Sequence, residues 1–274
     1  MKTYRIKEFA GNLGVTEKTL RHYEKYKIVE PSVDESNGYR SYNFRDAERI
    51  LVSRRFSSME FSVKETSRLL SESSIDEVME AFRIQSEKLE QKAEHLRLVA
   101  QRMRELEDEL GWFKGSANRG FIRKGNEWWF IRHVKNTEFV RDRESLGIIR
   151  KMMDALPCSV KMMPIPEKMT KDRDVIWGMA IEPRYAAALG IDFQPPMVKI
   201  PAGTCYVYPA VISAKKERIL EGGQDVPEIW GKIQRELEEM HVSVTGVPYV
   251  IGSIDSFSGE LREKHFLFWA PVKG

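Results

Sequence analysis

The stretch Val15–Glu24 reads Val-Thr-Glu-Lys-Thr-Leu-Arg-His-Tyr-Glu and decides the fold of the first part of the chain. Thr16 is a favourable N-cap, and Leu20 lies at a spacing that faces a core, so the stretch predicts a short helix. Tyr4–Ala10 also has apolar residues at helical spacing, and the two glycines within residues 11–14 end it. Two short helices joined by a tight, glycine-containing turn indicate a helix-turn-helix.

Turn and capping signals extend this domain. The Asn-Gly pair within Ser36–Tyr42 is a strong signal for a hairpin, which would form a wing beside the helices. Phe44–Met59 predicts a third helix, and Phe61–Leu70 predicts a fourth, which Ser62 opens as part of a capping box. We therefore expect residues 1–74 to form an α-helical, winged helix-turn-helix domain that binds double-stranded DNA.

A heptad pattern follows. Residues 75–111 contain no glycine or proline before Gly111, so they predict one long helix. Apolar side chains recur on it every seven residues, at Phe82, Leu89, Leu96, Met103 and Leu110. Such a repeat is typical of a dimerisation coiled coil, and the simplest partner is the same helix of a second subunit. The alternative is a core helix of a larger domain.

The pattern changes again after a predicted linker at residues 112–120. Residues 121–274 predict an α+β domain on a twisted antiparallel sheet. The expected strands are Phe121–Arg123, Trp128–Ile131, Asp174–Ile181, Thr204–Val211, Tyr249–Ile254 and His265–Ala270. Two helices are expected between them, at Leu146–Leu156 and Val226–Met240.

Composition excludes several classes of protein. No apolar run is long enough to span a membrane, and the N-terminus lacks the apolar segment of a secretory signal. Cys158 and Cys205 do not form a disulfide framework, so we expect a cytoplasmic protein. No catalytic or metal-ligand spacing is present, and no enzyme activity, metal or cofactor is expected. Residues 1–70 have an excess of Lys and Arg, as a phosphate-binding surface would.

Tyr4–Ala10, Val15–Glu24 and Gly38–Tyr42 resemble, in order and spacing, the DNA-binding domain of the MerR family. The long helix resembles the antiparallel coiled coil by which such proteins dimerise. Ile200–Val207 and Phe268–Lys273 are similar to the GyrI-like effector-binding domain of the multidrug-sensing members. The resemblance implies a homodimer on promoter DNA that bends and untwists the spacer when its effector binds, which realigns the promoter for RNA polymerase.

Side-chain chemistry predicts which residues of the second helix and the wing contact DNA. Short or forked side chains near the start of a recognition helix can read base edges, while wing side chains suit phosphates. The candidates are Thr16, Lys18, Thr19, Arg21, His22, Tyr23, Tyr39, Arg40, Tyr42 and Lys64. For Tyr23 and Tyr42 the alternative is packing in the core. His22 stands where the family often has a tyrosine.

The second half of the chain is rich in aromatic residues, which can enclose a small lipophilic effector and attract a cation. The candidates are Trp128, Trp177, Glu182, Tyr206, Tyr208, Trp230, Tyr249 and Phe268, with Glu182 as the anion. Core packing is the alternative for each aromatic residue, and Asp255, Glu260 and Glu263 are alternative anions. Drug-sensing relatives often place a glutamate at the position of Val250.

Two other functions stay open at this point, and a third is disfavoured. A GyrI-like domain can be adapted to hydrolyse small electrophiles, and the chain can also be an ordinary repressor that its ligand releases from DNA. A metal sensor is disfavoured, because such sensors place cysteines at the end of the dimerisation helix and Glu105–Gly120 has none.

Overall fold

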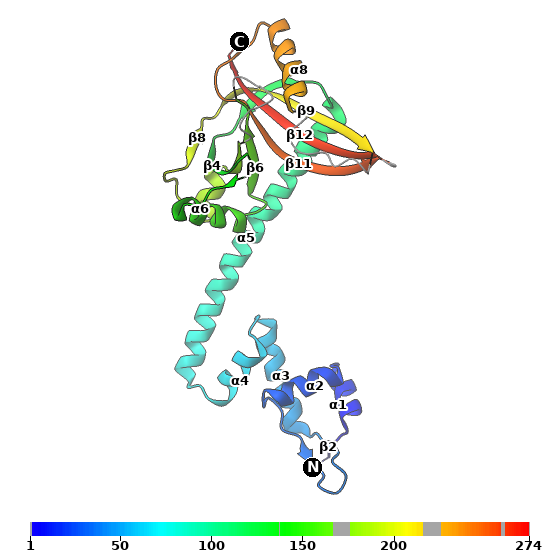
Figure 1. Cartoon of the computed structure of the whole chain (residues 1–274). Coiled ribbons are helices and arrows are strands. Elements are labelled where there is room, and N and C mark those ends of the chain that lie inside the picture. Colours follow the sequence, from blue (N-terminus) through cyan, green and yellow to red (C-terminus); the bar gives the residue numbers. More distant parts are fainter. Residues whose placement is uncertain (1, 137, 167–175, 216–225, 259–260, 274) are drawn as a thin grey trace. The chain divides into compact units, whose positions relative to one another are not determined.

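The computed structural model describes residues 2–136, 138–166, 176–215, 226–258 and 261–273. The chain divides into two compact units (Figure 1). Unit 1 reaches to Glu94, and unit 2 runs from His95 to the C-terminus. The long helix α5, Ile75–Ser116, contains the boundary between them.

Unit 1 is the predicted helix-turn-helix domain followed by the first part of α5. Its elements are α1 (Ile6–Leu13), α2 (Glu17–Lys25), β1 (Ser32–Val33), β2 (Arg40–Ser41), α3 (Phe44–Ser58) and α4 (Val63–Ser71). Gly14 ends α1 with φ 61°, a left-handed conformation that favours glycine. The Thr16 hydroxyl accepts a hydrogen bond from the Thr19 amide at 3.1 Å and so caps α2, as predicted.

Local signals also fix the wing and the next two helices. β1 and β2 pair antiparallel, and Gly38, with φ 70°, lies in the turn between them. Capping boxes open α3 at Asn43 and α4 at Ser62. In the sequence of α3, the apolar residues Ala47, Ile50, Leu51 and Phe56 predict one buried side, but the Leu51 side chain is 59% exposed.

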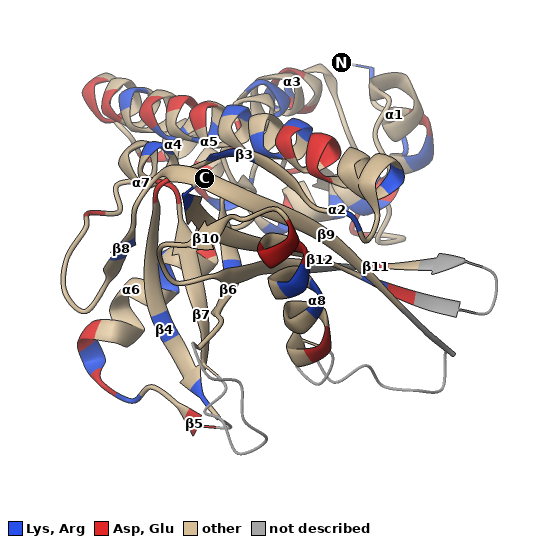
Figure 2. Ribbon diagram, turned by 90° about the horizontal axis from the view of Figure 1, so that it is seen from above, with Lys and Arg blue, Asp and Glu red and all other residues tan. Residues whose placement is uncertain are grey.

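Helix α5 continues to Ser116, which corrects the prediction that it ends at Gly111 and that residues 112–120 form a linker. Trp112 and Phe113 lie on the extra turn and pack against a buried cluster of the sheet in unit 2. Burial of two aromatic side chains outweighs the cost of about 1 kcal/mol for a glycine inside a helix. Figure 2 shows basic and acidic residues alternating along this helix.

Unit 2 is built on a 10-stranded antiparallel sheet, whose main path has the order β3-β9-β12-β11-β6-β7-β4-β5. β10 pairs with β12, and β8 pairs with β4. Its strands are β3 (Phe121–Gly125), β4 (Trp128–Lys135), β5 (Glu138–Phe139), β6 (Ser159–Pro164), β7 (Ile176–Ile181), β8 (Val198–Ile200), β9 (Gly203–Lys215), β10 (Ser243–Val244), β11 (Tyr249–Ser258) and β12 (Leu261–Lys273). Residues 174 and 175 of the expected strand Asp174–Ile181 lie outside the described part of the chain.

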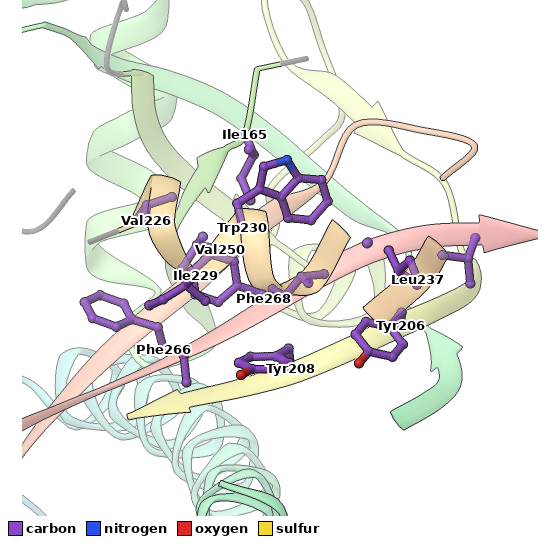
Figure 3. Close-up of a cluster of buried hydrophobic side chains, with 14 residues drawn as sticks. Ile165, Tyr206, Tyr208, Val226, Ile229, Trp230, Leu237, Val250, Phe266 and Phe268 are labelled. Atoms are coloured by element: carbon purple, nitrogen blue, oxygen red, sulfur yellow. The ribbon is translucent and has the colours of Figure 1, made fainter. Parts of the chain in front are cut away.

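Three helices complete unit 2: α6 (Arg143–Asp154), α7 (Pro183–Ala188) and α8 (Val226–Glu239). Helix α8 packs on one face of the sheet through Ile229, Trp230 and Leu237 (Figure 3). Successive residues of β9 and β12 alternate between two clusters, one beneath α8 and one that contacts the end of α5. The sheet thus separates α8 from the end of α5.

Candidate functional site

Helix α2 presents a basic, solvent-facing surface. Lys18, Arg21 and His22 are exposed, whereas Leu20 is fully buried. Thr19 is half-buried and shares a hydrogen bond of 2.8 Å with the Thr16 hydroxyl. The exposed side chains have the length and the donors needed to reach base edges or phosphates.

Glu24 connects the wing to α2. Its carboxylate accepts a hydrogen bond from the Arg40 Nε at 2.9 Å and another from the Tyr42 hydroxyl. The Arg40 side chain keeps 48% of its surface exposed, so it remains accessible to a phosphate. Lys64 on α4 and Tyr39 on the wing are exposed as well, and the Arg5 guanidinium lies 4.8 Å from the centre of the Tyr39 ring.

The structure corrects the prediction for Tyr23 and Tyr42. Both rings belong to the core of unit 1, with exposed fractions of 6% and 0%. Tyr42 stacks on Phe9 with the ring centres 4.9 Å apart. Burial and the hydrogen bond to Glu24 raise the pKa of Tyr42. Its ring therefore has a packing role, and it supports the wing from inside.

A cavity of about 560 Å³ lies in unit 2 against the end of α5. Helix α5, β3, β4, the β7–α7 corner, β11 and β12 all contribute to its wall. The lining residues are Arg102, Glu105, Glu107, Asp108, Glu109, Gly111, Trp112, Arg123, Asn126, Trp128, Glu182, Arg184, Ile251, Leu267 and Trp269. Five carboxylates thus face three guanidinium groups, and the cavity as a whole favours a cation.

The aromatic side of the cavity consists of Trp112, Trp128 and Trp269. The rings of Trp112 and Trp269 meet edge to face at 6.2 Å, and Tyr249 stacks behind Trp269 at 6.3 Å. The Arg123 guanidinium lies 4.4 Å from the centre of the Trp112 ring, as a cation–π pair. These indole faces can therefore hold a cation or a flat apolar group.

Glu182 and Glu105 form the carboxylate side. The buried Glu182, 5% exposed, accepts hydrogen bonds from Asn126 at 3.1 Å and from Arg184 at 2.9 Å. Glu105 accepts hydrogen bonds from Arg184 at 2.8 Å and from the Tyr185 hydroxyl, also at 2.8 Å. Burial raises the pKa of Glu105, but these hydrogen bonds lower it by more, so the pKa stays below its ordinary value.

Of the eight residues predicted to bind an effector, Trp128 and Glu182 line this cavity. Tyr249 is buried behind Trp269. Four others belong to the core between α8 and the opposite face of the sheet (Figure 3). Tyr206, Tyr208 and Phe268 come from the sheet, and Trp230 comes from α8. Trp177 contacts His133 and Phe139 rather than the cavity.

The alternation of side chains along each strand explains why these aromatic residues lie away from the cavity. Side chains alternate between faces, so Tyr208 and Phe268 point to α8 while their neighbours Val207 and Trp269 point to α5. Val250, where the resemblance led us to compare a glutamate of drug-sensing relatives, also lies in the core beneath α8 (Figure 3). The sequence shows the alternation, but not which face has the cavity.

The structure adds cavity residues that the sequence analysis missed. Arg102, Glu105, Glu109 and Trp112 recur every three or four residues and share one face of α5. The Arg102 side chain is only 3% exposed and donates to Glu109 at 2.8 Å. This second stripe on the helix is a signal that could have been found, but the heptad repeat concealed it.

The alternative anions lie elsewhere. Glu260 is outside the described residues, and Asp255 is exposed on β11. Glu263 belongs to a small group with Ser256 and His265, in which the Ser256 hydroxyl contacts His265 Nε2 at 3.3 Å. The Glu263 carboxylate lies 3.8 Å from that same nitrogen.

This group does not have the geometry of a hydrolase triad. A triad needs the nucleophile and the carboxylate on opposite nitrogens of the imidazole. Nδ1 of His265 instead is buried without a hydrogen-bond partner among the described residues. Burial lowers the pKa of His265 by more than the nearby carboxylates raise it.

Two further findings concern metals and membranes. No group of three or more His, Cys, Asp or Glu side chains in the described ranges is arranged to hold a metal ion. Within those same ranges, no helix is both long and apolar enough to cross a membrane.

The solved structures that match this chain have low structural similarity to it. An EcmrR–DNA complex is 16% identical, with 98% of this chain and 99% of that chain covered, at a TM-score of 0.35. The N-terminal part of MtaN, the multidrug transporter activator of Bacillus subtilis, is 28% identical over 39% of this chain and 94% of that chain, at a TM-score of 0.30. Both TM-scores are too low to establish the arrangement of the chain.

Sequence comparisons find relatives of unit 1. The regulator CueR of Yersinia pestis is 37% identical over 65 residues, which are 24% of this chain and 47% of the relative. A mercuric resistance operon regulatory protein of Bacillus cereus is 27% identical over 110 residues, which are 38% and 83%. The chain spans about half the length of the first curated relatives it matches. Residues 4–73 match the family model described as MerR HTH family regulatory protein, so unit 1 is similar to the helix-turn-helix domain of that family.

Proposed function

We propose that the protein is a transcription regulator of the MerR type that binds promoter DNA as a dimer and responds to a small molecule. The observation that carries the proposal is the exposed basic face of α2 in a domain that matches this family. Arg21 and Lys18 would reach base edges, and Arg40, Tyr39 and Lys64 would contact the phosphates.

A binding titration at fixed salt tests this part. The full-length protein is titrated with a duplex that it has selected from a random pool, and in parallel with a scrambled duplex. We expect the selected duplex to bind at least about a thousandfold more tightly, the lower end for specific regulators. Equal affinity for both duplexes contradicts a sequence-specific regulator. Arg83→Ala serves as the control, because Arg83 lies outside the proposed surface, in an exposed pair with Glu80.

A homodimer is the second part of the proposal. The heptad side chains Leu96, Met103 and Leu110 are 55%, 62% and 37% exposed on α5. An apolar stripe of this length on a charged helix is stable when another apolar surface buries it, and the α5 helix of a second copy has a matching stripe. Sedimentation of the full chain measures the oligomeric state.

A small lipophilic cation is the proposed effector, and the cavity of unit 2 is its binding site. Tryptophan walls accept a flat apolar body, and the surplus of carboxylates accepts the positive charge. All six tryptophans are in unit 2, and Trp112, Trp128 and Trp269 line the cavity. Ligand-dependent fluorescence therefore tests the site. Trp112→Phe should reduce the signal, whereas Trp177→Phe, which lies off the cavity, should retain it.

The proposed response is activation without release from DNA. The effector must bind the complex with bent DNA more tightly than the unbent one, because equal affinity would shift nothing. Transcription in vitro with RNA polymerase, combined with footprinting, separates the two cases. A ligand that removes the protein from its operator identifies an ordinary repressor instead.

A further inference from the structure

One side chain fills the position where a cationic ligand would meet the carboxylates of the cavity. Arg184 donates from Nε and Nη2 to Glu182 at 2.9 and 3.1 Å. It also donates from Nη1 and Nη2 to Glu105 at 2.8 and 2.9 Å. A single planar guanidinium thus holds two carboxylates, one from the β7–α7 corner and one from α5.

Hydrogen bonds hold the carboxylates of Glu182 and Glu105 in place, and Arg184 is the most exposed side chain of the three. Glu182 and Glu105 keep only 6% and 25% of their side-chain surface, whereas Arg184 keeps 46%. Asn126 holds Glu182 in place, and the Tyr185 hydroxyl holds Glu105, without help from Arg184. If the guanidinium swung outward, Glu182 would lose its ion pair with Arg184, and Glu105 would keep the longer contact with Arg102 at 3.5 Å. The vacated position beside these two carboxylates would then favour another cation.

The hydrogen-bond pattern defines that cation. Four contacts in the plane of one group require several N–H donors in a flat fork. An amidinium or a second guanidinium offers such a fork, while a quaternary ammonium has no N–H donor at all. The adjoining wall of Trp112, Trp128 and Trp269 would take an aromatic ring attached to the fork.

We propose that Arg184 is a built-in occupant of the cation position, and that the effector is an aromatic amidinium or guanidinium compound which displaces it. This inference rests on the proposed effector site. Displacement also removes a link between α7 and α5, because Glu105 belongs to α5. The arginine therefore competes with the ligand and couples ligand binding to the helix.

Burial lowers the pKa of Arg184, but Glu182 and Glu105 raise it by more through hydrogen bonds and charge, so the side chain stays a cation. Competition with a ligand is then a competition between two cations for the same two carboxylates. Removing the resident one should strengthen binding of the other.

The experiment compares two probes on the full-length protein by tryptophan fluorescence. Naphthamidine carries the flat fork, and naphthyltrimethylammonium carries the same ring and charge without N–H donors. We expect wild type to prefer naphthamidine, and Arg184→Met to bind it about tenfold more tightly, the factor for one lost ion pair of about 1.4 kcal/mol. The matched control is Arg83→Met, since Arg83 likewise bridges two glutamates, Glu80 and Glu87, but lies far along the sequence. Its affinity should equal that of wild type.

Several outcomes overturn the inference. Equal or weaker binding of naphthamidine by Arg184→Met does so, and so does equal affinity of wild type for the two probes. If Arg184→Met does not fold, Arg184→Lys decides, because an ammonium cannot span both carboxylates and should also give tighter binding than wild type. A neutral probe, naphthylmethanol, distinguishes a failure of the Arg184 inference from a failure of the proposed effector cavity. If naphthylmethanol alone quenches the fluorescence, the proposed effector cavity is supported and the role of Arg184 is overturned. If no probe quenches the fluorescence of wild type or of Arg184→Met, both the cavity and the role of Arg184 are overturned.

Discussion

Replacing the buried Arg102 should destabilise unit 2, and the structure sets the size of the effect. Arg102 is 2% exposed and donates to both oxygens of Glu109, at 2.8 and 3.4 Å. Removing one partner of a fully buried pair costs about 3 to 5 kcal/mol. Glu109 keeps 22% of its side-chain surface, so water offsets part of this loss and Arg102→Met should cost about 2 to 3 kcal/mol.

The assay is urea unfolding of the full chain, followed by tryptophan fluorescence. All six tryptophans follow residue 94, so the signal reports on unit 2 alone. The double variant Arg102→Met with Glu109→Leu replaces the ion pair by apolar groups and should recover most of the loss. Arg83→Met, in the exposed pair with Glu80, should leave the midpoint unchanged. A loss below about 1 kcal/mol for Arg102→Met, or a double variant as unstable as the single one, would refute the reasoning.

Three more predictions concern the other parts of the molecule. Leu96→Glu should convert the dimer to monomers in sedimentation, because it places two like charges in the proposed seam; an unchanged dimer would place the interface elsewhere. Arg21→Ala should cost about 1 to 3 kcal/mol of operator binding and relax base preference, whereas Arg40→Ala should weaken selected and scrambled DNA alike. Glu105 has a pKa held below its ordinary 4.5, so its stabilisation of unit 2 is complete above pH 4.5 and is lost as the pH falls below it. The urea midpoint of Glu105→Gln should consequently fall less than that of wild type over this acid range.

The helix-turn-helix could be predicted in detail because its signals are local. Thr16 caps its own helix, Ser62 opens a capping box, and Gly38 supplies the turn of the wing. Each of these depends on residues within a few positions of one another. Leu51 shows the limit, since a periodic pattern does not say which side of a helix its domain will cover.

The cavity could be predicted only in part, because its residues are brought together by the sheet. Trp128 and Glu182 could be named from residue type, but Arg184 and Glu105 are far apart in sequence and meet only in the folded unit. Strand alternation has two solutions until the helices on each side are known, so the sequence did not show that Tyr206, Tyr208 and Phe268 pack beneath α8 rather than on the face with the cavity. Trp112 was hidden by two nearby glycines that suggested a linker.

Helix α5 has two different stripes of side chains, and in the proposed mechanism they connect the ligand site of unit 2 to the proposed dimer seam. One stripe holds the exposed heptad side chains Leu96 and Met103, while the other holds Arg102 and Glu105 at the cavity. A ligand shifts an equilibrium only by the difference in its affinity for the two states. In the proposed mechanism, the difference in affinity arises at Glu105, because this carboxylate loses its ion pair with Arg184 and gains one with the ligand. The helix that carries Glu105 continues into unit 1, which we propose binds DNA, so the proposed exchange would act on a helix that both units share.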